Sequence, residues 1–177
     1  MSRIPALTYE AANNEQQHLL DAVQAQLGMV PNFLKVFAHS PAALKAFLGL
    51  HQIAGSGSLD VLTRERIALA IAQQNSCEYC VSAHTAIGGA SGLAPDEMAE
   101  NRAGRSQDAK AAVAVEFARV VMAHQGEVTT EEFLNLKKAG YSEAEIVEVL
   151  THIGMNFLTN IIGKVSRVEV DFPKVAI

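Results

Sequence analysis

The 177-residue sequence contains no tryptophan, and aromatic residues make up only 6% of it. It has no strongly basic segment, and its formal net charge of -5 lacks the excess of basic residues that is typical of nucleic-acid-binding domains. No window approaches about 18 consecutive apolar residues, and the first residues do not resemble a signal peptide. We therefore expect a cytoplasmic protein that binds neither nucleic acid nor membrane.

The apolar residues, 49% of the chain, are mainly Ala, Val, Leu and Ile. Because Ala and Leu favour helix, this composition predicts close helix packing in an all-α fold. The mean hydropathy of +0.14 is high for a chain with 19% charged residues. We therefore expect some apolar surface to be buried between subunits of a homo-oligomer. Residues 1–177 contain no linker or low-complexity segment, so we expect a single domain.

Helical spacing of apolar residues, together with capping residues, predicts most of the secondary structure. The segment 168–172 alternates briefly with period 2 and is predicted to be an extended arm. The predicted helices cover residues 11–27, 32–38, 41–54, 63–75, 77–89, 107–124, 129–139 and 142–162, with a further short element after residue 91.

The chain has only two cysteines, Cys77 and Cys80, and they are three residues apart. If the helices on either side of residues 75 and 76 are antiparallel, Glu65 and His84 both lie about 13–15 Å from the turn, at the same level on neighbouring helices. Cys80 and His84 are four residues apart and share one helical face. We therefore expect these four side chains to form a single site.

This arrangement suits a reactive dithiol. Cys77 is predicted near a helix N-terminus, which stabilises a thiolate. His84 can accept a thiol proton, and Glu65 can orient the imidazole and stabilise the imidazolium. One sulfur can attack a peroxide to form a sulfenic acid, and the other can resolve it to a disulfide. The residues alone leave open which cysteine attacks.

The pattern of Glu65, eleven residues, Cys77-x-x-Cys80, three residues and His84 resembles the core motif of the alkylhydroperoxidase D (AhpD)-like proteins, within the carboxymuconolactone decarboxylase superfamily. The resemblance is best over residues 41–93. It implies a helical bundle, trimeric or hexameric, that needs no cofactor and reduces a small peroxide. A dithiol reductant, either a lipoyl-bearing or a thioredoxin-like protein, then restores the thiols. It also implies Cys80 as the attacking thiol and Cys77 as its resolving partner.

One position departs from this motif, because Tyr79 stands before the second cysteine where the family often has a histidine. A tyrosine hydroxyl, with a pKa near 10, is a poor base at neutral pH. We expect Tyr79 to shape the pocket rather than to transfer protons.

Two other functions use the same residues. The pair could form a non-enzymatic redox sensor or binding module, whose disulfide switches assembly or partner binding. Cys77, Cys80, His84 and Glu65 could instead bind zinc, although a second Cys-x-x-Cys is missing; we favour no metal. The other five histidines are predicted to be structural. For Asn156 and Asn160, a pocket and a subunit contact remain open.

Overall fold

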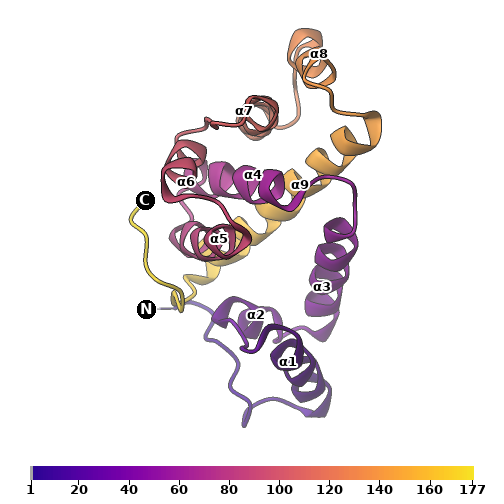
Figure 1. Cartoon of the computed structure of the whole chain (residues 1–177). Helices are drawn as coiled ribbons and strands as arrows, with labels where there is room; N and C mark the ends of the chain where they lie inside the picture. The colour runs from indigo at the N-terminus through magenta and orange to yellow at the C-terminus, as the bar shows by residue number, and fades with distance from the viewer. Residues whose placement is uncertain (1) are drawn as a thin grey trace.

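The computed structural model describes residues 2–177, and every regular element among them is an α-helix (Figure 1). The expected all-α fold is therefore confirmed. The helices are α1 (Asn14–Leu27), α2 (Asn32–Phe37), α3 (Pro41–Gly55), α4 (Val61–Gln74), α5 (Glu78–Ser91), α6 (Pro95–Arg102), α7 (Ala109–Ala123), α8 (Thr130–Lys138) and α9 (Glu143–Ser166).

Side-chain caps explain where most of these helices begin. The hydroxyl of Ser142 accepts a hydrogen bond from the backbone N–H of Glu145, whose carboxylate accepts one in return, and this capping box starts α9. The helix α4 begins at Val61, two residues before the predicted start, because the Asp60 carboxylate accepts from the N–H of Thr63. The helix α9 extends beyond the predicted residue 162 and ends at Ser166.

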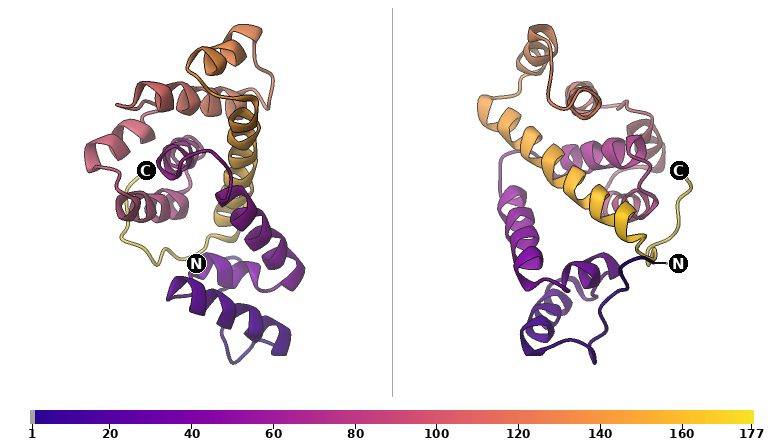
Figure 2. Two further views of the ribbon diagram at one scale, coloured as in Figure 1. Left: turned by 45° about the vertical axis from the view of Figure 1, so that its right-hand side comes forward. Right: turned by 180° about the vertical axis from the view of Figure 1, so that it is seen from behind.

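The helix α4 lies at the centre of the bundle, where it packs against α5, α6, α7 and α9. The long helix α9 crosses the molecule between an end formed by α1, α2 and α3 and an opposite end formed by α7 and α8 (Figures 1 and 2). This topology brings α9, which is distant in sequence, beside the consecutive helices α3, α4 and α5.

A buried carboxylate joins α4 to α6. The Glu97 side chain is 5% exposed and accepts hydrogen bonds from the Arg66 Nε, 2.7 Å away, and the Asn101 Nδ2, 2.9 Å away. It also accepts from the Ser106 hydroxyl and the Gln107 backbone N–H. Burial acts to raise the pKa of Glu97, but these hydrogen bonds lower it to about 2. The carboxylate therefore holds α6 and the following loop in place while it is ionised.

The helix α9 has a buried face and an exposed apolar face. It is long and apolar enough to cross a membrane, with a mean hydropathy of 1.3 over 18 residues, of which 44% are buried in the fold. This is weak evidence for a membrane span, because a core helix passes the same test. The exposed apolar side chains of α9 are Val147, Leu150, Phe157, Leu158, Ile161 and Val165.

The chain after α9 is extended and forms no strand in the described part of the molecule. It passes along α5, where the backbone N–H of Val175 donates to the Ser82 hydroxyl over 3.1 Å. The predicted extended arm at 168–172 is therefore present without a strand partner. Its position places the C-terminal segment beside the cysteine-bearing helix (Figure 1).

Candidate active site

The central pair of helices brings Glu65 and His84 together. A short turn, in which Ser76 has a positive φ of 52°, joins α4 to α5. The Nδ1 atom of His84 lies 2.9 Å from the Glu65 Oε2, and the side chains are 21% and 13% exposed. With Nδ1 as the donor, the second ring nitrogen, Nε2, is left to accept a proton.

The two cysteines are joined by a disulfide at the start of α5. Cys77 is the N-cap residue, and its sulfur accepts a hydrogen bond from the backbone N–H of Cys80 over 3.3 Å. Both residues are almost fully buried, Cys77 at 1% exposure and Cys80 at 4%. The helix N-terminus that the sequence predicted to activate a thiolate therefore points at the Cys77 sulfur.

The helix α9 packs closely against the disulfide. A Cβ atom added to Gly163 would lie 3.2 Å from the Cys77 sulfur and 3.6 Å from the Cys80 sulfur, so glycine allows the close approach. One turn earlier, Asn160 is 1% exposed and accepts a hydrogen bond from the Asn75 amide over 3.0 Å. The sulfur of Cys77 therefore lies in a closed interface.

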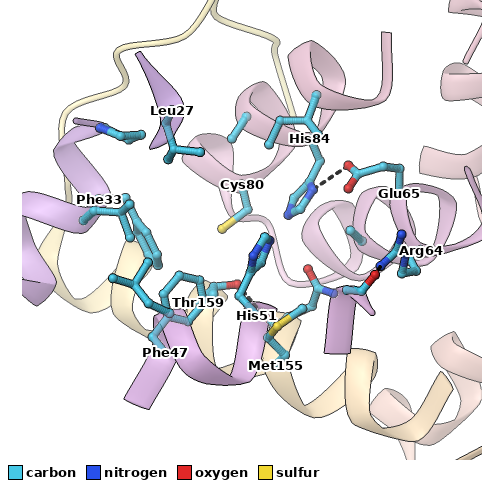
Figure 3. Close-up of a pocket in the computed structure, with 18 of the residues that line it drawn as sticks. Leu27, Phe33, Phe47, His51, Arg64, Glu65, Cys80, His84, Met155 and Thr159 are labelled. Atoms are coloured by element: carbon cyan, nitrogen blue, oxygen red, sulfur yellow. Dashed lines mark hydrogen bonds and ion pairs between the residues drawn. The ribbon is translucent and has the colours of Figure 1, made fainter. Parts of the chain in front are cut away.

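The Cys80 sulfur borders a cavity of about 400 Å³, which Cys77 does not line (Figure 3). Six helices contribute side chains to its wall, with α1 and α2 at one end and α3, α4, α5 and α9 around the rest. These include Phe47 and His51 from α3, Arg64, Glu65 and Ala68 from α4, Cys80, Ala83 and His84 from α5, and Met155, Asn156 and Thr159 from α9. The volume is within the range of small-molecule binding sites.

Three basic side chains that the sequence did not assign to the site also line this wall, namely His51, Arg64 and His152. Burial is the main cause that lowers the pKa of His51, and the charge of the neighbouring His84 lowers it further. Burial likewise lowers the pKa of His152, whose Nε2 lies 3.3 Å from the carbonyl oxygen of Ala54. The only signal in the sequence for these residues was the presence of a polar side chain on a helix face that is otherwise apolar.

Tyr79 also lines the cavity, but its hydroxyl is occupied. It donates to the Asp171 Oδ1 over 2.9 Å and accepts from the Phe33 N–H over 3.3 Å. Its ring stacks on Phe33 and contacts Phe172 edge-on. Burial and the charge of Asp171 raise its pKa above the ordinary value. Tyr79 therefore fastens α2 and the C-terminal segment to α5.

The described residues contain no cluster of three or more His, Cys, Asp or Glu side chains that could hold a metal ion. The sulfurs that a zinc ion needs as thiolates are bonded to each other. Asn156, left open by the sequence, lines the cavity, whereas Asn160 does not.

Residues 41–123 match the model of the carboxymuconolactone decarboxylase family. No protein of curated function matches the chain. Among solved structures, a peroxidase-related protein from Silicibacter sp. TM1040 is 26% identical, with a TM-score of 0.82 over 94% of this chain and 91% of that one.

A second peroxidase-related protein, an alkylhydroperoxidase AhpD core from Ralstonia eutropha JMP134, is 24% identical, with a TM-score of 0.86 over 96% of this chain and 92% of that one. The debrominase Bmp8, solved in complex with 2,3,4-tribromopyrrole, is 17% identical, with a TM-score of 0.79 over 97% of this chain and 92% of that one. At these identities the likeness concerns the fold.

The structure defines the chain as a helical protein with a disulfide-bonded Cys-x-x-Cys pair. Together with the family match over residues 41–123 and the relative from Silicibacter, these features support the assignment of the chain as an AhpD-like member of the carboxymuconolactone decarboxylase superfamily.

Proposed function

We propose that this protein is a thiol-dependent peroxidase that cycles between the Cys77–Cys80 dithiol and its disulfide. The observation that carries the proposal is the asymmetry of the pair. Cys80 borders the cavity beside the hydrogen-bonded Glu65 and His84, whereas Cys77 is bonded to it from the closed side. A substrate in the cavity can therefore reach Cys80 but not Cys77.

In the reaction, the Nε2 atom of His84 accepts the proton of the Cys80 thiol while Glu65 stabilises the imidazolium. The thiolate attacks one oxygen of the peroxide, and the O–O bond breaks. This step yields a sulfenic acid on Cys80 and an alkoxide, which takes the proton from His84 to become an alcohol. The Cys77 thiolate then attacks the Cys80 sulfur and forms the disulfide, and the released hydroxide is protonated to water.

A dithiol reductant must then return the disulfide to two thiols by thiol–disulfide exchange. A lipoyl-bearing or thioredoxin-like protein would meet this need. The missing histidine at position 79 is offset in part by His51, which brings an imidazole to the same cavity from α3. The cycle needs no metal or cofactor.

Single-cysteine variants test this proposal. Steady-state consumption of cumene hydroperoxide, with dihydrolipoamide as the reductant, should vanish in both Cys80→Ser and Cys77→Ser. In Cys77→Ser a single turnover should leave a sulfenic acid on Cys80, which dimedone traps for mass spectrometry. Consumption at the parent's rate in both variants would refute the proposal.

The relay is tested with His84→Gln and Glu65→Gln, with the exposed His18→Gln as the control. Thiol alkylation as a function of pH, resolved for each cysteine, should show an acid-shifted Cys80 in the reduced parent and a more alkaline one in His84→Gln. The His18 variant should match the parent. Identical profiles for the parent, His84→Gln and His18→Gln would remove His84 from the mechanism.

We further propose that the exposed apolar face of α9 packs against other copies of the chain in a trimer or hexamer. Phe157 is 46% exposed and Val165 is 54% exposed on this face, and nothing in the described chain covers them. Exposed apolar patches of this kind mark protein interfaces. The family resemblance implies the same assembly.

A redox-sensing role is the second candidate, because α9 carries both the apolar face and Gly163, which lies against the two sulfurs. A change at the disulfide could therefore alter how the chains associate. Light scattering on oxidised and reduced protein discriminates the two functions. A large redox-dependent change in mass with slow peroxide turnover favours the sensor.

A further inference from the structure

The cavity beside Cys80 has chemically different ends. Figure 3 shows Leu27, Phe33 and Phe47 at one end and Arg64 at the other, with Cys80, His51 and His84 between them. The aromatic end is part of a buried cluster, in which the Phe37 and Phe47 rings stack at a centroid distance of 5.0 Å. A ligand that fills the whole cavity therefore meets hydrocarbon on one side of the reactive sulfur and a cation on the other.

The guanidinium of Arg64 lines this end of the cavity, and its hydrogen-bonding capacity is only partly used within the chain. One of its terminal nitrogens donates to the carbonyl oxygen of Gly55 over 2.7 Å, but its Nε is buried without a hydrogen-bond partner. No carboxylate in residues 2–177 forms an ion pair with it, in contrast to Arg66, whose Nε is paired with Glu97. A buried N–H of a charged group without an acceptor is unfavourable, so an anionic ligand at this position gains a strong hydrogen bond.

Other groups at this end do not neutralise the arginine. The Glu65 carboxylate is turned to His84. The Glu148 carboxylate, one turn before His152 on α9, accepts from the backbone N–H groups of Ser58 and Leu59. Two imidazoles on the wall, those of His51 and His152, resist protonation and leave Arg64 as the permanent cation of the cavity.

We infer that the substrate is an apolar carboxylic acid whose hydroperoxide group lies partway along the chain, as in an internal hydroperoxide of a fatty acid. The carboxylate pairs with Arg64, and the hydrocarbon beyond the hydroperoxide lies against Phe33 and Phe47. The peroxide oxygens then face Cys80. The identity of the reacting group rests on the proposed peroxidase function, whereas recognition of the acid does not.

Binding is measured without turnover on the oxidised protein, using the fluorescent fatty acid cis-parinaric acid and its methyl ester. We expect the acid to bind at least tenfold more tightly than the ester. Arg64→Gln should reduce the affinity for the acid to that for the ester, and Arg64→Lys should retain part of the difference. The control Arg105→Gln removes an exposed arginine outside the cavity and should bind the acid as the parent does.

Equal binding of acid and ester by the parent would overturn the inference, even if the Arg64 variants fail to fold. Peroxide turnover separates this inference from the proposed function. If cumene hydroperoxide is reduced but the acid is not preferred, the carboxylate site is wrong and the peroxidase stands. If the acid binds through Arg64 but neither cumene hydroperoxide nor 13-hydroperoxyoctadecadienoic acid is consumed, the peroxidase is wrong and an acid-binding site remains.

Discussion

The contact between Gly163 and the disulfide gives a prediction whose magnitude can be estimated. In Gly163→Ala the added methyl would approach the Cys77 sulfur to 3.2 Å, closer than the roughly 3.5–4.0 Å of favourable contacts between carbon atoms. Neither side can easily move, because the sulfur is bonded to Cys80 and Cys77 is only 1% exposed. Overpacking of this kind costs about 1–3 kcal/mol.

An alanine in a helix interior also stabilises by up to about 1 kcal/mol relative to glycine. The matched control is Gly49→Ala in α3, where an added Cβ meets nothing within 4 Å. In urea unfolding of the disulfide form, Gly49→Ala should raise the free energy of unfolding. The free energy of unfolding of Gly163→Ala should lie about 1–3 kcal/mol below that of the control.

A double-mutant cycle isolates the sulfur contact. In a Cys77→Ala background, the sulfur that is 3.2 Å from the added methyl is absent, and the next contact, to Cys80, is an ordinary 3.6 Å. In that background, Gly163→Ala should no longer lower the free energy of unfolding. If Gly163→Ala is as stabilising as Gly49→Ala in the parent, α9 does not pack against the disulfide as described, and the argument for a closed side of the site fails.

Three further predictions concern the surroundings of the site. Tyr79→Phe removes the hydroxyl that joins Asp171 to the Phe33 N–H and should cost about 1–3 kcal/mol; unchanged urea unfolding would contradict this role. Because the folded pKa of Glu97 is about 2 against an ordinary 4.5, its ionised form contributes up to about 3 kcal/mol above pH 4.5. That contribution should be lost as the pH falls towards 2. The stability difference between the parent and Glu97→Gln should therefore shrink over this range, and a constant difference in thermal unfolding would refute the assignment. Phe157→Glu places a charge on the exposed face of α9 and should reduce an oligomer to the 18.9 kDa monomer in light scattering; a monomeric parent would refute the proposed assembly.

Local sequence signals were enough to predict the helical fold and the contact between Glu65 and His84. Capping residues such as Ser142 mark the helix starts directly. The spacing of Glu65 and His84 about a short turn predicted that the two side chains could meet, and they lie 2.9 Å apart. Such predictions succeed because they depend on helical geometry and on neighbours close in sequence.

The cavity was decided by tertiary structure. His51, Arg64 and His152 belong to three helices, and the sequence offered no reason to place them near Cys80. The contact of Gly163 with the sulfurs was likewise hidden, because a helical glycine has no local signature of what packs against it. Packing between distant segments depends on the whole core. The sequence alone therefore determined that the cysteine pair lies near Glu65 and His84, whereas the tertiary structure determined which cysteine borders the cavity and which charges surround it.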